Sequence, residues 1–474
     1  MPKTLVIAEK PSVANDLAKA LGKFTKKDDF FESDDTVITS AIGHLVELCL
    51  PNEMDKKRGK WSFANLPIVP DHFDLKAKEK TLSRFNLIKR LLKRADIGDV
   101  VNACDAGREG ELIFHYVIQL AGSKKPTRRL WLQSMTPEAI RQGFAHLRAG
   151  KEMIPLTDAA VCRSESDWLV GINATRALTA FNSKGGGFQL TPVGRVQTPT
   201  LAILAVREEK IRAFQSRPYF EVFGDFGVAA GVYCGRWFDE KFKKGADEDA
   251  KAERLWERAT AEAIVAKCTG KPGVITEEKK PTTQISPQLY DLTTLQREAN
   301  SRFGLSAKRT LQIAQALYEK YKVLTYPRTD SRYMPDDNLA NVKNVMGKLE
   351  IDDLAAHGRK ALQSGWVNLN RRVFNNAKVT DHHAIIPTGV SPKALDDFEL
   401  KVYDMVARRF VAVFYPAAQF EVTTRITRVE GEAFKTDGKI LIEPGWLAVY
   451  GKQAAGEDDQ TVVPIAKDER AKTE

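Results

Sequence analysis

Residues 3–9 read KTLVIAE and residues 11–21 read PSVANDLAKAL, and these two segments decide the fold of the first part of the chain. The apolar run predicts a buried strand, and the second segment, with proline in its first turn, predicts a helix. Strand-like segments recur at residues 99–104 and 129–133, each followed by polar residues. After the second, residues 134–138, SMTPE, resemble a helix start with a capping residue. We therefore predict an α/β domain over residues 1–155, with polar groups gathered at the strand ends where open sheets place their sites.

The rest of the chain predicts further lobes, because single cores rarely grow past roughly 250 to 300 residues and this chain has 474. Gly304 and Ser306 separate two helical patterns, which resemble a helix-turn-helix pair. We expect the last residues to be polar and loose. The predicted divisions are a helical lobe at 156–214, a strand-rich lobe in two parts at 215–280 and 410–452, a helical lobe at 281–409 and a polar tail at 453–474.

Composition limits the classes of function. The formal net charge of +10 suits a polyanionic partner, because lysine and arginine release counterions when they neutralise phosphates. The longest apolar run, residues 226–234, is far shorter than the roughly 18 residues that a membrane span needs. The N-terminus lacks the layout of a secretory signal, and the five cysteines form no C-x-x-C pair. We therefore expect a cytoplasmic protein with no membrane segment, disulfide framework or zinc ribbon.

A tyrosine at residue 326 is a candidate nucleophile. It stands in the segment LTYPRTDS, residues 324–331, just after a basic helical pattern. A Tyr-Pro turn places the phenol of Tyr326 on an irregular segment, and Arg328 can hold a phosphate oxygen against it. The alternative is that Tyr326 is a half-buried aromatic that anchors a loop. Tyr318 and Tyr321 lie nearby on a predicted helix, where we expect them to pack.

A group of carboxylates is a candidate metal site. Glu9 follows the first predicted strand, and Asp105, Glu109 and Glu111 follow another. Carboxylates brought to one sheet edge can bind Mg²⁺, which prefers a few oxygen ligands together with water and phosphate. Lys10, beside Glu9, is a candidate phosphate contact. The alternative is that these acidic residues and Lys10 are solvated surface groups.

Seven segments in order along the chain carry a resemblance: VIAEKPSVA (6–14), IGHLVEL (42–48), CDAGREGELI (104–113), RSESDWLVGINATRALT (163–179), VGRVQTPTL (193–201), LTYPRTDSRY (324–333) and DHHAIIPT (381–388). Together they resemble the type IA DNA topoisomerases of the bacterial topoisomerase III kind. The resemblance implies a Toprim fold for the first domain and a helix-turn-helix relative for the nucleophile domain. It also implies a strand-rich arch, with the domains arranged around a central hole.

The resemblance also implies roles for individual residues. Tyr326 matches the nucleophile, Arg328 and Lys10 match the residues that contact the scissile phosphate, and His382 matches a phosphate-contacting histidine, whereas we expect His383 to be structural. The implied magnesium ligands are Glu9, Asp105 and Glu109. The implied single-strand DNA contacts are Trp61, Trp168, Arg176, Pro192, Val193, Gly194, Arg195, Val196, Gln197 and Arg328. For Trp168, a packed position on an apolar helix face remains an alternative.

The implied activity is ATP-independent cleavage of one DNA strand through a 5′-phosphotyrosyl bond at Tyr326, strand passage and religation. Relaxation of negative supercoils and decatenation would follow, by a monomer that works on single-stranded and negatively supercoiled DNA, with a helicase as a further partner. Two alternatives are a noncatalytic single-strand-binding module and a Toprim nuclease or primase.

The sequence departs from the family in two places. Gly107 stands where many relatives carry a second aspartate, so the predicted metal site has lost a carboxylate. The sequence also stops at Glu474, before the stretch that normally completes the DNA-binding domain, and we expect weak relaxation for that reason.

Overall fold

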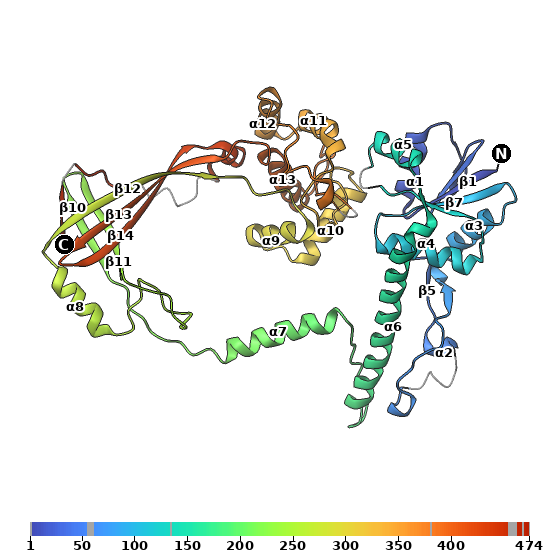
Figure 1. The fold of residues 1–474 in the computed structure, drawn as a ribbon, viewed down its shortest axis with the longest axis horizontal. Coiled ribbons are helices and arrows are strands. Elements are labelled where there is room, and N and C mark those ends of the chain that lie inside the picture. Colours follow the sequence, from blue (N-terminus) through green and yellow to red (C-terminus); the bar gives the residue numbers. More distant parts are fainter. Residues whose placement is uncertain are drawn as a thin grey trace. The chain divides into compact units, whose positions relative to one another are not determined.

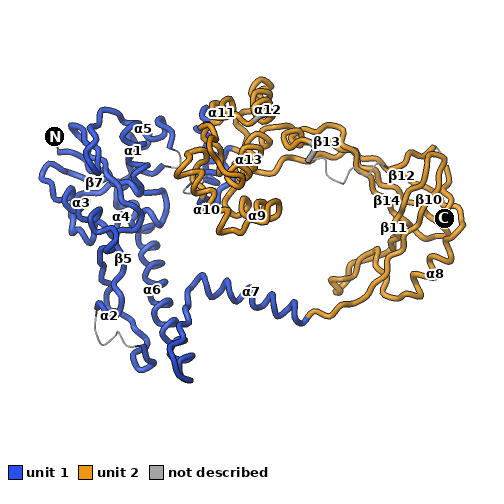
Figure 2. Tube along the Cα trace, turned by 180° about the vertical axis from the view of Figure 1, so that it is seen from behind, with its two compact units in different colours: residues 1–213, 328–341, 374–384 blue, residues 214–327, 342–373, 385–474 orange. Residues whose placement is uncertain are grey.

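The computed structural model describes residues 2–54, 61–132, 135–379, 382–453, 462–466 and 469–473. The chain divides into two compact units, shown in separate colours in Figure 2. Unit 1 consists of Met1–Ala213, Arg328–Asn341 and Phe374–Ala384, and unit 2 of Phe214–Pro327, Val342–Val373 and Ile385–Glu474. The boundary between the units therefore passes through the predicted nucleophile segment, between Pro327 and Arg328.

A seven-stranded sheet forms the centre of unit 1, in the order β2-β3-β4-β1-β7-β8-β9. The central strand β1 pairs in parallel with β4 on one side and β7 on the other, and β7 pairs in parallel with β8. The strands are β1 (Lys3–Ala8), β2 (Thr25–Lys26), β3 (Phe30–Glu32), β4 (Thr36–Ser40), β7 (Ile97–Ala103), β8 (Thr127–Arg129) and β9 (Arg148–Ala149). The predicted α/β domain is thus built on four adjacent parallel strands, β4, β1, β7 and β8.

Helices cover both faces of this sheet (Figure 1). Along β1, Leu5 and Ile7 point to the face covered by α3 (Leu82–Leu92) and α4 (Arg108–Ala121). Val6 and Ala8 point to the face covered by α1 (Pro11–Leu21) and α5 (Pro137–Ala145). Successive side chains of a strand alternate between faces, so a continuous apolar run is what a strand buried on both sides requires.

The third predicted strand was placed a few residues too late. We predicted it at residues 129–133, but β8 covers Thr127–Arg129, where it pairs with Val100–Asn102 of β7. Pairing with a neighbour sets the ends of a strand, and the apolar pattern alone does not reveal that register. Residues 133 and 134 lie outside the described residues. The predicted helix start is confirmed, because the Thr136 hydroxyl accepts a hydrogen bond from the Ala139 amide at the beginning of α5.

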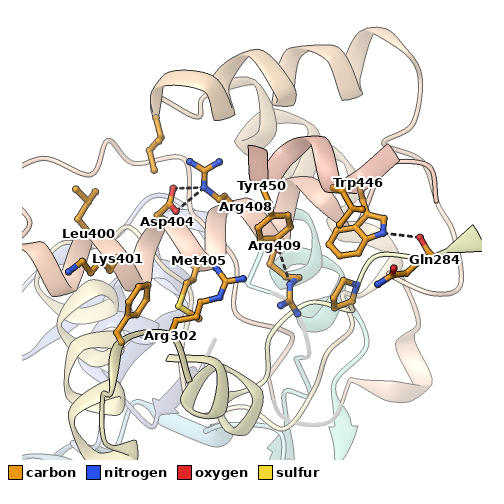
Figure 3. Close-up of a pocket in the computed structure, with 14 residues that line it drawn as sticks. Gln284, Arg302, Leu400, Lys401, Asp404, Met405, Arg408, Arg409, Trp446 and Tyr450 are labelled. Atoms are coloured by element: carbon orange, nitrogen blue, oxygen red, sulfur yellow. Dashed lines mark hydrogen bonds and ion pairs between the residues drawn. The ribbon is translucent and has the colours of Figure 1, made fainter. Parts of the chain in front are cut away.

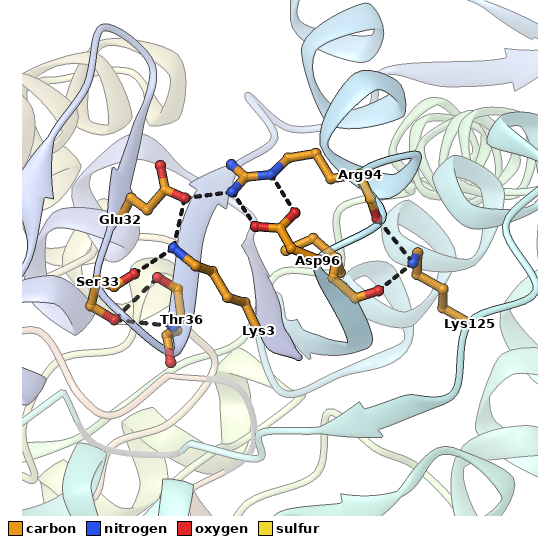
Figure 4. Close-up of polar contacts among 8 residues, drawn as sticks. Lys3, Glu32, Ser33, Thr36, Arg94, Asp96 and Lys125 are labelled. Atoms are coloured by element: carbon orange, nitrogen blue, oxygen red, sulfur yellow. Dashed lines mark hydrogen bonds and ion pairs between the residues drawn. The ribbon is translucent and has the colours of Figure 1, made fainter. Parts of the chain in front are cut away.

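An ion-pair network joins the amino ends of β1 and β7 to the carboxyl end of the antiparallel β3, at the edge of the sheet opposite to the predicted site (Figure 4). Glu32 accepts from Lys3 Nζ at 2.9 Å and from Arg94 at 2.5 Å, and Arg94 also pairs with Asp96. Lys125 donates to the carbonyl oxygens of Arg94 and Ile97. These contacts connect β1, β3 and the start of β7 at the edge of the sheet that carries no predicted functional residue.

Long helices follow the sheet domain in sequence. These are α6 (Ile154–Asn182) and α7 (Gln197–Arg212), and none of the residues of α7 is buried. No helix in the described part of the chain combines the length and apolar character needed to cross a membrane. Smaller elements of unit 1 are β5 (Val46–Leu48), β6 (Leu75–Ala77), α2 (Pro51–Met54), and the 3-10 turns at Phe63–Asn65, Glu79–Thr81, Gly150–Met153, Asp336–Asn338 and Asn376–Lys378.

The helices of unit 2 include the predicted helix pair. Gly304 ends α9 in the left-handed conformation with a φ of 67°, and the Ser306 hydroxyl caps α10 by accepting from the Arg309 amide. Both predicted signals are confirmed. Tyr321, however, lies beyond the end of α10, because the chain turns away at Lys322, whose φ is 60°. These helices include α9 (Leu292–Phe303), α10 (Ala307–Glu319), α12 (Asp352–Gln363) and α13 (Asp397–Ala412). The helix α11 (Leu339–Gly347) begins in unit 1 and continues into unit 2.

A cavity of about 870 Å³ opens beside α13 in unit 2 (Figure 3). Arg408 pairs with Asp404 at 2.8 Å, and Arg409 donates to the Tyr450 hydroxyl at 3.1 Å. The Trp446 indole donates to the carbonyl oxygen of Gln284 at 2.8 Å. None of the predicted site residues is among those that line this cavity.

The strand-rich part of unit 2 is a closed barrel in the order β10-β11-β14-β13-β12-β15. Its strands are β10 (Phe223–Val228), β11 (Gly231–Phe238), β12 (Pro272–Gln284), β13 (Ala418–Val429), β14 (Glu432–Glu443) and β15 (Arg470–Thr473), accompanied by α8 (Arg258–Cys268) and the 3-10 segment η7 (Gly445–Gln453). The expectation of a loose tail is wrong for β15, which pairs with β10 and β12 and buries Ala471 completely. In a closed barrel every strand has hydrogen-bonding partners on both sides, which explains why this polar segment forms a strand.

Candidate active site

The two carboxylates of the candidate site are brought together by neighbouring parallel strands. Glu9 follows the last residue of β1, and Asp105 lies two residues beyond the end of β7. Because β1 and β7 are adjacent and parallel, their carboxyl ends meet at one edge of the sheet. The backbone amide of Asp105 donates to Glu9 Oε2 at 3.3 Å.

Lys10 joins these carboxylates. Its Nζ atom lies 2.7 Å from Asp105 Oδ2 and 3.3 Å from Glu9 Oε1. Lys10 is the N-cap residue of α1 and has an extended backbone. The predicted neighbours Glu9, Lys10 and Asp105 therefore form one cluster of alternating charge.

His382 completes this cluster from a distant part of the sequence. Its Nε2 atom donates to Asp105 Oδ2 at 3.2 Å. The segment that carries it lies beside the segment that follows Arg328, since the Thr329 hydroxyl donates to the carbonyl oxygen of His382 at 2.9 Å. The Ala384 amide donates to the carbonyl oxygen of Tyr333 at 3.0 Å. These contacts lie within unit 1 and hold the imidazole over the sheet edge.

The cluster separates the proton affinities of its two carboxylates. Burial raises the pKa of Glu9, and the neighbouring charge of Asp105 raises it further, against the opposing effect of Lys10. Burial also acts to raise the pKa of Asp105, but the hydrogen bond from His382 and the charge of Lys10 outweigh it, so the pKa lies well below its usual range. Asp105 therefore carries the negative charge, and Glu9 takes up a proton more readily.

The donor set at this edge fits Mg²⁺. Glu9 and Asp105 supply the carboxylate oxygens that this ion prefers, and Mg²⁺ sites commonly take only one or two carboxylates, with water and phosphate as the other ligands. No group of three or more His, Cys, Asp or Glu side chains arranged to hold a metal ion occurs in the described part of the chain.

The two acidic residues on α4 lie in different surroundings. Glu109 is exposed and pairs with His44 at 3.2 Å and with Arg163 at 3.9 Å. Glu111 is buried and pairs with Arg129. The resemblance implies Glu109 as the third magnesium ligand, but the ion pairs of Glu109 are with His44 and Arg163 and not with the cluster of Glu9, Lys10, Asp105 and His382.

Tyr326 lies on the irregular segment after α10, in unit 2. The Thr325 amide donates to the carbonyl oxygen of Ile386 at 3.0 Å, and the Ile386 amide donates to the Thr325 hydroxyl at 2.9 Å. The half-buried ring of Tyr326 packs edge-on against Tyr318, with 5.4 Å between the ring centroids. Arg328 is exposed and belongs to unit 1. The residue directly before Tyr326 is therefore held by two hydrogen bonds to Ile386.

A basic pocket of about 480 Å³ lies at the start of α4 and along α6. Arg108, Arg163 and Arg195 line it together with Asp167. Arg195 donates to Asp167 at 3.0 Å, which holds the guanidinium against α6. The pocket suits phosphate binding, because three arginines and one aspartate give its lining a net positive charge.

Hydroxyl groups on α6 hold the backbone of the predicted DNA-binding segment. The Thr175 hydroxyl accepts from the Val193 amide at 2.9 Å, and the Thr179 hydroxyl accepts from the Thr191 amide at 3.0 Å. Pro192 lies between the two tethered residues, and Gly194 follows them. Val196 and Gln197 are exposed and lie at the start of α7. The sequence analysis did not identify Arg108, Arg163, Thr175 or Thr179 as site residues. The two threonines are spaced four residues apart, which places them on one face of a helix, and this spacing was the available signal.

The two tryptophans differ in their surroundings. Trp61 is 39% exposed, and its ring lies 5.4 Å from the Arg176 guanidinium and 5.5 Å from the Phe188 ring. Trp168 is 9% exposed, donates its indole N–H to the carbonyl oxygen of Cys49 and packs edge-on against Phe73. Trp61 is thus open to a stacking base, whereas the geometry of Trp168 supports the packed alternative.

Comparisons with known proteins show the family of this chain. A family model described as Toprim domain matches residues 4–134, and one described as DNA topoisomerase matches residues 151–474. DNA topoisomerase 3 of Bacillus subtilis (strain 168) is 42% identical over 464 residues, which cover 97% of this chain and 61% of that protein. DNA topoisomerase 3 of Bacillus licheniformis is 42% identical over 475 residues, which cover 98% of this chain and 63% of that protein.

The chain thus spans slightly more than three fifths of the length of these curated relatives. The structure of full-length topoisomerase I from Thermotoga maritima matches 99% of this chain and 70% of its own, with a TM-score of 0.65 and 20% identity, which shows the fold alone. The predicted multidomain α/β fold is confirmed in its α/β sheet and its further domains, which include a β-barrel. The resemblance seen in the seven motifs is likewise confirmed, and the chain belongs to the type IA DNA topoisomerase family.

Proposed function

We propose that this protein cleaves one DNA strand through Tyr326, allows another strand to pass and reseals the break, as a magnesium-dependent topoisomerase III. The observation that carries the proposal is the convergence of Lys10 and His382 on one oxygen of Asp105, beside Glu9. A cluster of alternating charge at the carboxyl edge of a sheet suits a phosphodiester, whose charge increases in the transition state.

The reaction conserves the number of phosphodiester bonds. The Tyr326 oxygen attacks phosphorus, the bond from phosphorus to the 3′ oxygen breaks, and the phenol proton leaves as the 3′ oxygen gains one. A 5′-phosphotyrosine and a 3′-hydroxyl result, and the reverse attack restores the strand without ATP. In this proposal Arg328 and Lys10 stabilise the phosphate, Lys10 serves in the proton transfer, and His382 donates a hydrogen bond. When held by Glu9 and Asp105, with Glu109 as the predicted third ligand, Mg²⁺ supplies positive charge beside the phosphate.

Binding of the strand is assigned to the basic pocket and the tethered segment. Arg195 supplies a cation to the backbone, and Trp61, which lies over the buried Arg176 guanidinium, supplies a stacking surface that tolerates any base. In this proposal residues 1–155 form the metal-binding domain, 156–214 begin the single-strand-binding domain, and 281–409 carry the nucleophile. The two parts of the strand-rich lobe, 215–280 and 410–452, correspond to the arch that the family resemblance implies.

The biological setting completes the proposal. A monomer relaxes negative supercoils and decatenates DNA of the cytoplasmic nucleoid, and a helicase exposes the single strands on which it acts. These parts rest on the family and on the net charge of +10.

The decisive experiment is covalent capture on a denaturing gel. The protein is incubated with a labelled single-stranded oligonucleotide and quenched with denaturant, and a band of DNA-linked protein is expected. Tyr326→Phe should abolish that band, whereas Tyr318→Phe, on the ring that packs against it, should retain it. An adduct that survives Tyr326→Phe would remove the mechanism. Strand binding without any adduct would favour a noncatalytic binding module, and hydrolysed strands without an adduct would favour a nuclease.

A further inference from the structure

A buried arginine lies beneath the loop that carries Asp105. Arg129 ends β8, and its side chain is 1% exposed. Its guanidinium donates to the carbonyl oxygens of Asn102 at 3.0 Å, Cys104 at 2.7 Å and Leu130 at 2.9 Å, and also to that of Asp105 at 2.6 Å. Backbone groups before, within and beside the loop are thus held by one side chain.

Glu111 holds this arginine in turn. The Nε atom of Arg129 lies 2.6 Å from Glu111 Oε1, and the Glu111 side chain is 5% exposed. Asn102 contributes to the same network, because its side-chain oxygen accepts from the Cys104 amide at 3.0 Å. The network therefore joins the end of β7, the Asp105 loop and the first turns of α4.

The backbone of Asp105 is confined from other directions as well. Its carbonyl oxygen accepts from the Gly107 amide at 2.8 Å. A Cβ atom added at Gly110 would lie 2.1 Å from that oxygen, so α4 approaches the loop as closely as glycine allows. The loop is held so closely that its backbone sets where the Asp105 carboxylate points.

A stabilising role alone does not account for this arrangement. A buried ion pair loses the hydration of both charges, and replacing such a pair with apolar residues is often neutral or stabilising. What an arginine adds is a rigid fork of five N–H donors, which can hold several carbonyl oxygens in a fixed geometry. A lysine would keep the charge, but its donors all lie on one atom.

We propose that Arg129, held by Glu111, is a positioning residue that aims the Asp105 carboxylate at Lys10 and His382 for strand cleavage. This inference rests on the proposed function and deepens it. In this inference, the Arg129–Glu111 pair contacts neither Tyr326 nor the carboxylate groups of Glu9 and Asp105. The pair acts on Asp105 only through the backbone of its loop.

The first test needs no catalytic activity. Amide hydrogen exchange of residues 104–112, followed by mass spectrometry, reports the loop directly. The amides of Cys104, Asp105 and Glu111 are hydrogen-bonded, to Asn102, Glu9 and Gly107 respectively, and would exchange faster if the loop loosened. Arg129→Lys should raise the exchange rate of this segment about tenfold or more, with the rest of the sheet unchanged. The matched control is Arg148→Lys, an exposed arginine stacked on the same Trp131 ring that also faces Arg129. Equal exchange in Arg129→Lys and the wild type would overturn the proposal.

A charge-neutral variant covers the case in which Arg129→Lys does not fold. Arg129→Met combined with Glu111→Gln removes both charges, so neither is left buried without its partner. Faster exchange confined to residues 104–112 in this double variant would support positioning. Global unfolding of both variants would assign the pair to the stability of the sheet and overturn the positioning role.

The second test connects the pair to the chemistry. The rate of adduct formation is measured for Arg129→Lys in the wild-type and Asp105→Asn backgrounds. If Arg129 acts through Asp105, its substitution should slow the wild type by about 30-fold or more but change the Asp105→Asn protein by about twofold at most. Equal effects in the two backgrounds would refute action through Asp105. Absence of any adduct from the wild type would refute the proposed function, while the exchange result would still decide the role of Arg129 in the loop.

Discussion

The Nε2 atom of His382 lies 3.2 Å from Oδ2 of Asp105, although 277 positions separate the two residues. The same oxygen receives Lys10 Nζ at 2.7 Å. A carboxylate held by a histidine and a lysine stays ionised beside the more readily protonated Glu9. The site therefore presents an ordered set of charges before any substrate arrives.

His382→Ala should slow adduct formation by about 10²-fold, because loss of one positioned donor at a developing charge typically costs that much. Affinity for a single-stranded oligonucleotide should stay nearly constant, since most of it comes from phosphate contacts elsewhere. Single-turnover cleavage and fluorescence anisotropy measure the two quantities. His383→Ala is the control, because the His383 ring hydrogen-bonds to the carbonyl oxygen of the adjacent Ala384 instead of to the carboxylate cluster. A larger loss of rate in His383→Ala than in His382→Ala would contradict the assignment.

Arg163→Ala and Arg195→Ala should each weaken single-strand binding, because both arginines line the basic pocket beside the tethered segment. Each lost phosphate contact should reduce the slope of log affinity against log salt by about 0.7. Titrations at several salt concentrations measure this slope. Arg258→Ala, at an exposed i,i+4 pair on α8, should leave the slope unchanged. An unchanged slope in both pocket variants would show that the DNA strand binds elsewhere on the protein.

Trp61→Ala and Trp168→Ala should affect different quantities. Trp61 is exposed beside Arg176, and its removal should cost about 1–3 kcal/mol of binding to a single strand. Trp168 is packed, and its removal should lower the free energy of unfolding by about 3–5 kcal/mol. Binding titrations and urea denaturation distinguish these outcomes. A weakened affinity in a fully stable Trp168→Ala protein would restore the DNA-binding role that the resemblance implied.

Gly107→Asp should lower the magnesium concentration needed for relaxation, because it adds a carboxylate beside Asp105. Gly107 has a φ of −170°, which any residue adopts, and it is the N-cap of α4. Aspartate should therefore also stabilise α4 by a few tenths of a kcal/mol. Gly107→Asn is the control, since asparagine caps a helix without adding charge. Identical magnesium curves for the wild type and both variants would show that the site does not depend on a carboxylate there.

Glu32→Gln should lower the free energy of unfolding by about 0.5–1 kcal/mol at pH 7, the usual range for such ion pairs. The hydrogen bonds from Arg94 and Lys3 lower the pKa of Glu32 in the folded state. The stabilisation is therefore fully present above the pKa of the unfolded carboxyl and is lost as the pH falls through the folded value. Urea denaturation from pH 7 down to pH 3 should show the variant and the wild type converging. Glu138→Gln, at an exposed pair, should show a smaller difference, and a difference that grows on acidification would contradict this account.

The sequence by itself determined the features that depend on neighbouring residues. The apolar run that became β1, the capping threonine of α5 and the Gly304–Ser306 break each act within a few residues, so their effects can be read from the letters. The strand-end positions of Glu9 and Asp105 followed in the same way, because parallel strands bring their carboxyl ends to one edge.

Only the tertiary structure decided which side chains meet across long separations. The contact of His382 with Asp105 was not readable from spacing, and neither was the clamp of Arg129 beneath the Asp105 loop. The burial of Trp168 and the exposure of Trp61 likewise depend on what packs against each ring, and β15 is a strand because the barrel supplies its partners. Local propensities act over a few residues, whereas burial and long-range pairing depend on the whole packed chain.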